Sequence, residues 1–348
     1  MKTTAAILVE LGQPLELVEL GIPPLKPGQV LVEIAFSGVC HTQVLEARGY
    51  RGQDKFLPHC LGHEGSGIVC EIGEGVTRVA PGDQVILSWI KGAGLDVPGT
   101  VYDWNGRAVN AGGITTFSRH AVIAENRLTK LPPGVPMKDA ALVGCAVATG
   151  AGAVFNAAHP QPGSSLAVFG IGGVGLCAVA AAALSGCNPI IAVDLKPEKL
   201  ALARQMGATD TIAAGETDAV AALTALCPGG VDYAIEATGR PPVMVQALSS
   251  VRMQGGAAVI VGNAHFDERL EIDPRQLNQG KKLLGTWGGD SVPDRDYPHY
   301  CELIASGRLQ LGPMLSPPYP LGAINQALAD LEAALVVRPI IDMTAETG

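Results

Sequence analysis

The sequence predicts an α/β protein with two domains, one mostly β and the other built on a doubly wound parallel sheet. Three observations support this prediction. The chain has 348 residues, and at about 150 residues per domain two domains are expected. Short apolar runs separated by Gly, Pro and Asp extend as far as Pro132. From about Cys145 onward, apolar strands alternate with helices.

The first part of the chain has the pattern of β-strands joined by tight turns. Its alternating or β-branched runs include residues 30–35, 68–72 and 85–87. Gly, Pro and Asp separate these runs, as is typical of turns between strands. We therefore expect a mostly β domain that forms a partial barrel.

The second part alternates between strand and helix. Strands are predicted at 166–169 and 190–193, and helices over the Ala-rich stretch that ends at Ser185 and over 196–206. Later strands are predicted at the following positions: 231–235 and 257–261. Such alternation is typical of parallel strands covered by helices on both faces.

The chain changes again after Thr286, where it becomes rich in Pro. Residues 324–335 have the pattern of a helix, and a further segment follows at 336–343. We expect this C-terminal part to return to the first domain. The predicted boundaries are 1–147 and 287–348 for the mostly β domain, and 148–286 for the parallel-sheet domain.

The composition favours a small molecule as partner. The formal net charge is −9 and no block of Lys or Arg is present, which argues against binding to nucleic acid or to an anionic membrane. The apolar run before Glu10 is too short for a signal peptide, and we expect no stretch of the roughly 20 apolar residues that a membrane span needs. Eight scattered cysteines fit a reducing compartment. A cytoplasmic protein is therefore expected.

Three side chains that favour zinc occur in distinctive contexts: Cys40 in SGVCHT, His63 in GHEGSG and Cys145 in GCAVATG. A Cys2His set is one of the ligand combinations of catalytic zinc sites, which keep a fourth position open for water or substrate. A structural zinc site would be closed by a fourth protein ligand. The three residues are far apart in sequence, so only the fold can bring them together. We predict that they bind one catalytic Zn²⁺.

A glycine-rich turn, GIGGVG, lies between a predicted strand and a predicted helix. A dinucleotide-binding fingerprint requires this context, because its glycines let backbone N–H groups approach a pyrophosphate at a helix N-terminus. Asp194, at the end of the next strand, would accept hydrogen bonds from the adenosine ribose and repel a 2′-phosphate, which favours NAD over NADP. Lys199 is a second candidate for the ribose. The predicted NAD contacts are Gly170, Ile171, Gly172, Gly173, Val174, Gly175, Asp194 and Lys199.

With these features in chain order, the sequence resembles the zinc-containing alcohol dehydrogenases of the medium-chain dehydrogenase/reductase superfamily. The resemblance covers almost the whole chain and rests on GHEGSGIVCEIGEGV, GCAVATG, SLAVFGIGGVG, IAVDLKPEKLALARQMGATD and VRPII. It implies a GroES-like catalytic domain, a Rossmann domain, and hydride transfer between an alcohol and NAD. Polyol-type relatives tend to have Glu at the position of Cys145, so the chain looks closer to the alcohol and glutathione-dependent formaldehyde dehydrogenases.

The resemblance also implies roles for other residues. Glu64 is expected behind the metal, and Thr42 is expected to hydrogen-bond the substrate hydroxyl. Contacts to the nicotinamide are expected from Thr149, Val261, Gly262 and Asn263, and contacts to the pyrophosphate from His41 and Arg338. Homodimers or homotetramers are the assemblies that the resemblance suggests.

The sequence departs from the family in the region of its structural zinc. The family often has four closely spaced cysteines there, but no cysteine lies between Cys70 and Cys145. We therefore expect one catalytic zinc per chain and no structural zinc. The segment from Trp89 to Gly113 reads as a loop instead. The two tryptophans of this segment, Trp89 and Trp104, either line the substrate cleft or anchor the loop.

A second departure concerns proton transfer. Relatives commonly have a histidine three positions after the residue that matches Thr42, and this chain has Leu45 there. The usual relay cannot be completed, so either solvent or His59 should take the proton. His59 is the less favoured of the two, because it also reads as a polar neighbour on the loop before the metal.

Several alternatives stay open at this stage. Cys60 could compete for the metal, but a further thiolate would close the site, so we favour a buried thiol. A zinc-free quinone or enone reductase of the same superfamily would retain the glycine-rich turn and lack the metal ligands. A non-catalytic dinucleotide-binding protein is the alternative from another class. The substrate alcohol cannot be deduced from the sequence.

Overall fold

The computed structural model of the chain describes residues 1–345 and separates into two compact units. The first unit comprises Met1–Cys145, Val292–Gly307 and the chain from Leu315 onward, and the second comprises Ala146–Ser291 and Arg308–Met314. Residues 308–314 were expected with the mostly β domain. They lie in the second unit because their apolar side chains are buried there, with Met314 against Cys177.

The first unit contains a small closed barrel. Its strands, in order around the barrel, are β1 (Lys2–Leu8), β2 (Glu16–Gly21), β7 (Val101–Trp104), β8 (Arg107–Asn110) and β4 (His59–Cys60). Alternate apolar residues of these strands fill the interior, including Ile7, Leu20, Tyr102 and Val109, all almost fully buried.

A second sheet of the same unit leads into two of the predicted metal ligands, because β3 ends shortly before Cys40 and β5 begins directly after His63. Its strands are β10 (Leu128–Lys130), β6 (Gln84–Ser88), β5 (Glu64–Ile72), β3 (Gln29–Gly38), β18 (Ile340–Asp342) and β17 (Tyr319–Pro320), with β9 (His120–Ala124) also paired to β3. Strand β18 pairs antiparallel with the end of β3. The C-terminal segment is thereby tied to the strand that leads into Cys40.

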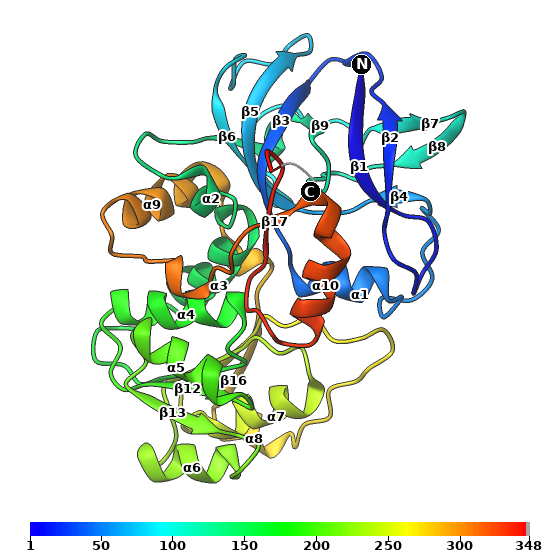
Figure 1. Ribbon diagram of the computed structural model, residues 1–348. Helices are drawn as coiled ribbons and strands as arrows, with labels where there is room; N and C mark the ends of the chain where they lie inside the picture. The colour runs from blue at the N-terminus through cyan, green and yellow to red at the C-terminus, as the bar shows by residue number, and fades with distance from the viewer. Residues whose placement is uncertain (346–348) are drawn as a thin grey trace. The chain divides into compact units, whose positions relative to one another are not determined.

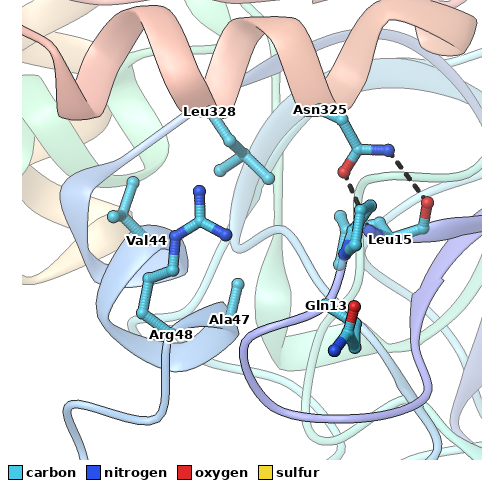
Figure 2. Close-up of a pocket in the computed structure, with 8 residues that line it drawn as sticks. Gln13, Leu15, Val44, Ala47, Arg48, Asn325 and Leu328 are labelled. Atoms are coloured by element: carbon cyan, nitrogen blue, oxygen red, sulfur yellow. Dashed lines mark hydrogen bonds between the residues drawn. The ribbon is translucent and has the colours of Figure 1, made fainter.

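Within residues 1–345, the first unit also contains the α-helices α1 (His41–Ala47), α2 (Met137–Ala140), α9 (Pro293–Ala305) and α10 (Ile324–Glu332). Helix α10 packs against α1 (Figure 1). The two helices line a cavity of about 130 Å³, where Asn325 exchanges two hydrogen bonds of 2.8 and 2.9 Å with the backbone of Leu15 (Figure 2). Arg48, at the end of α1, pairs with Glu332 of α10 at 2.8 Å.

The second unit is a six-stranded sheet. Its strand order is β13 (Asp210–Ala213), β12 (Ile190–Asp194), β11 (Leu166–Phe169), β14 (Tyr233–Glu236), β15 (Ala257–Ile260) and β16 (Lys282–Gly285). Every neighbouring pair is parallel. This is the usual order of a doubly wound dinucleotide-binding sheet, so the predicted α/β fold class is confirmed.

Helix α3 (Ala148–Gly152) precedes the first parallel strand, and the other α-helices of this unit connect the parallel strands. These connecting helices are α4 (Gly173–Leu184), α5 (Pro197–Gln205), α6 (Ala219–Leu226), α7 (Pro241–Ser250) and α8 (Arg275–Asn278). The Ala-rich helix α4 is buried over most of its length, which explains why its pattern was apolar on all sides. Strands β13 and β16 and helices α6, α7 and α9 have no counterpart among the elements predicted from the sequence.

The segment from Trp89 to Gly113 is not simply a loop. It contains the hairpin β7–β8, whose tip is Asn105 and Gly106, with φ of 52° and 88°. An Asn-Gly pair between two short strands is a strong signal for such a turn, and it was overlooked. Trp104 packs at the edge of the barrel core, and Arg107 lies over its ring at 5.6 Å.

One stretch contradicts the expectation that no segment would be long and apolar enough to span a membrane. Helical residues Met137–Ala158, 22 in number, pass that test by length and composition. However, 83% of the most apolar window is buried inside the protein, as in a core helix. The apolar character of this stretch is therefore explained by packing.

We predict that Gly175→Ala destabilises the protein, because a Cβ at this position would collide with the carbonyl oxygen of Gly170. The free energy of unfolding in urea should fall by about 1–3 kcal/mol. Gly172→Ala is the matched control, since its φ is −91° and a Cβ would meet no atom within 4 Å. Equal stability of the two variants would contradict the argument.

Candidate functional site

The three predicted metal ligands come together in the first unit. Cys40 precedes α1, His63 precedes β5, and Cys145 lies in a π-helical turn, Val143–Val147. Their ligand atoms all lie within 4.8 Å of one another, and His63 Nε2 is 3.2 Å from Cys145 Sγ. Turns of this kind are frequent at functional sites. Residues distant in sequence thus form one cluster with the donor set of an open zinc site.

The charges of this cluster suit a divalent cation. The hydrogen bond from Cys145 holds the pKa of Cys40 well below its usual range despite burial, and Arg338 adds to the effect. The same hydrogen bond, with burial and the Cys40 charge, raises the pKa of Cys145 well above its usual value. Cys145 therefore keeps its proton and donates it to Cys40 in this hydrogen bond. A bound metal would displace that proton and be neutralised by two thiolates.

His63 experiences opposing influences in the same cluster. Burial lowers its pKa, but the hydrogen bond and charge of Cys40, together with the charge of Glu64, outweigh burial and raise the pKa. Its Nε2 points to the sulfurs and its Nδ1 points to Gln43. Nε2 is therefore the atom placed to bind a metal.

Behind the ligands, Glu64 and Arg338 form a buried ion pair. Their side chains are 0% and 4% exposed. Burial lowers the pKa of Arg338, but the carboxylate of Glu64 and both thiols outweigh burial and raise it. The charge of Glu64 acts on the predicted ligand His63, and its place behind a bound metal stays a prediction. The guanidinium of Arg338 pairs with Glu64, and its buried Nε makes no hydrogen bond within residues 1–345, so the expected contact of Arg338 to a pyrophosphate stays a prediction.

Gln43 is a functional residue that the sequence analysis missed. It is 1% exposed, and its Oε1 accepts a hydrogen bond of 2.9 Å from the Cys40 N–H, while its Nε2 contacts His63 Nδ1. One amide thus connects two of the three metal ligands. Such partners orient ligands and tune metal affinity. Its position three residues after a cysteine that begins a helix was the only available signal.

Thr42 lies on α1 beside the metal ligand Cys40. The Thr42 hydroxyl oxygen is 3.7 Å from Cys40 Sγ, which fits a group that acts beside the metal. His41 begins α1 and is exposed. Leu45 is buried and offers no group that exchanges protons.

His59 and Cys60 are held by other contacts. His59 Nε2 lies 2.6 Å from the Asp54 carboxylate, and Nδ1 lies 2.9 Å from the Cys60 carbonyl oxygen. Since both ring nitrogens have hydrogen-bond partners, His59 fits a polar residue on the loop before the metal better than a proton acceptor. Burial raises the pKa of Cys60 to about 12, so this thiol stays protonated and is a poor metal ligand.

The glycine-rich turn of the second unit joins β11 to α4. The Asp194 carboxylate at the end of β12 accepts hydrogen bonds from the backbone of Ile171 at 2.7 Å and of Lys196 at 3.0 Å. It therefore fixes the turn in position. A Cβ on Gly172 would meet no atom within 4 Å, so open space lies beside the N-terminus of α4. The arrangement fits a pyrophosphate.

The predicted nicotinamide contacts and Lys199 also lie in this unit, whereas His41 and Arg338 belong to the first unit. Thr149 belongs to α3, and its buried hydroxyl makes no hydrogen bond within residues 1–345, as expected of a group that serves a ligand. Residues Val261, Gly262 and Asn263 follow β15, at the carboxyl edge where ligands of such sheets bind. Lys199 is half-buried on α5.

The three tryptophans lie in different surroundings, and whether Trp89 or Trp104 lines a substrate cleft stays a prediction. The carbonyl of Trp89 accepts a hydrogen bond from Arg127, and Trp104 belongs to the barrel hairpin. Trp287 is 73% exposed, and its backbone N–H donates a hydrogen bond to the Asp290 carboxylate at 3.2 Å.

Comparisons with known proteins agree with this site. Residues 26–133 match the family described as alcohol dehydrogenase GroES-like domain, and residues 173–306 match that described as zinc-binding dehydrogenase. The chain is 37% identical to an S-(hydroxymethyl)glutathione dehydrogenase of Synechocystis sp., in an alignment that covers 98% of this chain and 100% of that protein.

Two solved structures are similar over nearly the whole chain. One is an alcohol dehydrogenase zinc-binding domain protein from Burkholderia ambifaria, with 33% identity, a TM-score of 0.92, and coverage of 99% of this chain and 100% of that one. The other is a benzyl alcohol dehydrogenase from Acinetobacter calcoaceticus, with 31% identity, a TM-score of 0.90 and the same coverage. The similarity therefore includes both units.

We predict that Gln43→Glu binds zinc about 10-fold more tightly than the wild type. A His63 that binds metal through Nε2 carries its ring proton on Nδ1, where the structure has the amide nitrogen of Gln43. To accept that proton, the side-chain amide of Gln43 would have to rotate by about 180° so that its oxygen faces His63. The Cys40 N–H would then lose this oxygen as its hydrogen-bond acceptor. A carboxylate accepts both hydrogen bonds.

The zinc dissociation constant is measured by competition with a chromogenic chelator. Gln43→Leu should bind zinc roughly 10- to 100-fold more weakly than the wild type. Gln13→Glu adds the same charge at an exposed position and serves as the control, which should bind zinc like the wild type. If Gln43→Glu weakens binding as much as Gln43→Leu does, the proposed mismatch is wrong.

Proposed function

The chain belongs to the zinc-containing alcohol dehydrogenases of the medium-chain dehydrogenase/reductase superfamily, and from this membership we propose that it oxidises a small alcohol to the aldehyde or ketone with NAD. The observation that carries the proposal is the cluster of Cys40, His63 and Cys145. When bound, zinc would polarise the substrate oxygen as a Lewis acid, and NAD would accept the hydride.

The residues of the chain have separate roles in this reaction. Cys40, His63 and Cys145 hold the metal and leave its fourth position for the substrate. Thr42 accepts the hydroxyl proton of the alcohol, and solvent then takes it, since Leu45 is apolar and His59 is engaged by Asp54 and Cys60. Glu64 and Arg338 fix the electrostatic surroundings of the ligands.

NAD is proposed as the cofactor because of residues in the second unit. Asp194 would repel the 2′-phosphate of NADP, and the open space at Gly172 suits a pyrophosphate. The unpartnered hydroxyl of Thr149 favours a contact to the nicotinamide, together with Val261, Gly262 and Asn263. Lys199 would contact the ribose, and His41 and Arg338 the pyrophosphate.

We propose one catalytic zinc per chain and no structural zinc. No cysteine occurs between Cys70 and Cys145, and the hairpin β7–β8 lies in that region. The alignment with the Synechocystis sp. relative spans 368 positions against 348 residues here, so the relative has segments that this chain lacks. A homodimer or homotetramer and a cytoplasmic location are part of the same proposal, and free thiols at all eight cysteines suit a reducing compartment.

The alternatives are less favoured. A zinc-free quinone or enone reductase would have no need of the assembled Cys2His cluster, and the family match is to zinc-binding dehydrogenases. A non-catalytic dinucleotide-binding protein would not require Thr42 and the buried Glu64 beside that cluster.

The proposal predicts that the zinc-loaded protein reduces NAD when supplied with one or more alcohols of a panel. The panel includes benzyl alcohol and S-(hydroxymethyl)glutathione, which the names of the relatives suggest. NADH absorbance measures turnover, and NADP should be a poorer acceptor. Cys145→Ser should lose both bound zinc and turnover. An active, metal-free Cys145→Ser protein would overturn the proposal.

Removal of the Thr42 hydroxyl should lower kcat on the order of 100-fold, because proton transfer from the alcohol loses its acceptor. Thr42→Val tests this expectation at saturating alcohol and NAD. Thr42→Ser keeps the hydroxyl and should retain most of the activity. Similar rates for Thr42→Val and the wild type would show that Thr42 does not handle the proton.

A further inference from the structure

We propose that the first unit has a second transition-metal site, on the outer face of its sheet, formed by Glu33, Cys70 and His120. One carboxylate oxygen, one sulfur and one imidazole nitrogen of these residues lie within 4.8 Å of one another. The metal would be a borderline divalent cation such as Zn²⁺. None of the three residues takes part in the alcohol dehydrogenase reaction proposed above.

The strand pairing brings these residues to the same face. Glu33 on β3 lies directly opposite His120 on β9 and, on its other side, opposite Ile68 on β5. Cys70 follows Ile68 by two residues, so its side chain leaves the same face of the sheet as that of Ile68. Adjacent strands therefore supply one ligand each.

A β-bulge adjusts the position of Cys70. The register of β3 and β5 shifts between Leu31 and Val32, which pair with Glu71 and Val69, so no residue of β3 is directly opposite Cys70. Bulges of this kind redirect side chains. The Cys70 sulfur is thereby within reach of Glu33 rather than confined to a cross-strand pair.

The donor set and the spacing suit zinc. Thiolate, imidazole and carboxylate are its usual protein ligands. Bond lengths of about 2.0–2.3 Å put the ligand atoms of a tetrahedral site roughly 3.4–3.6 Å apart. Since the three atoms lie within 4.8 Å of one another, they need to approach by no more than about 1.4 Å, which side chains at the surface can accommodate. Glu33 and Cys70 are exposed and His120 is half-buried, so water would fill the fourth position.

The protonation states favour metal capture. Burial lowers the pKa of His120, despite the opposing charge of Glu33 and with help from Arg119, so its imidazole is neutral at pH 7. His120 Nδ1 is buried and makes no hydrogen bond within residues 1–345. Burial and the Glu33 charge raise the pKa of Cys70, so a metal must displace its proton. Because a proton is released, metal binding at this site should strengthen as the pH rises.

The test uses the zinc-loaded protein, in which the catalytic site is already filled. Equilibrium dialysis against Co²⁺ should add about one cobalt per chain while the catalytic zinc is retained, with a thiolate-to-cobalt charge-transfer band in the near ultraviolet. Cys70→Ser should abolish that band, and Cys70→Ser and His120→Gln should each raise the cobalt dissociation constant 10-fold or more. Glu33→Gln should also weaken binding.

Matched variants control for charge and for thiol reactivity. Glu71→Gln removes a neighbouring carboxylate of β5, and Cys227→Ser removes a thiol of the second unit; both should bind cobalt like the wild type. Unchanged turnover of Cys70→Ser and His120→Gln with an active alcohol, or an unchanged unfolding midpoint, shows that they are folded. The proposal fails if the wild type takes up no additional cobalt, or if Cys70→Ser and His120→Gln bind it as well as the wild type.

Discussion

The interaction on which the metal cluster depends is the buried ion pair between Glu64 and Arg338. Each partner is almost completely removed from water, so neither charge is stable there without the other. Removal of one partner of such a pair costs about 3–5 kcal/mol. Arg338 also interacts with both cysteine ligands, and Glu64 with His63. The pair therefore sets the charge balance of a site that holds two thiols and an imidazole.

This dependence explains why the chain returns to the first unit at its end. Arg338 directly precedes the segment whose strand β18 pairs with β3, and β3 leads into Cys40. The first part of the sequence thus supplies the carboxylate of the buried ion pair, Glu64, and the last part supplies its guanidinium, Arg338. Val44, Ala47 and Arg48 lie toward α10 (Figure 2). These contacts hold α1 in place, and α1 also carries Thr42 and Gln43.

The sequence was sufficient for the fold class and for the residues whose chemistry is distinctive. Cys40, His63 and Cys145 could be recognised from their neighbours, and the glycine-rich turn from its place between a strand and a helix. Gln43 could not, because an amide on a short helix gains its importance only from the ligand beside it. The short edge strands β13 and β16 lacked a clear period, and their pairing partners determine them.

The winding of the chain around Cys145 limits which changes of length the protein can accept. Residues Val143–Val147 form a turn wider than that of an α-helix. Deletion of one residue there would restore ordinary winding and rotate the sulfur by about 100° around the axis. The hairpin tip at Asn105 and Gly106, by contrast, is an exposed turn that an insertion can lengthen. Insertions and deletions among related chains should therefore gather at the hairpin and avoid the turn that carries the thiol.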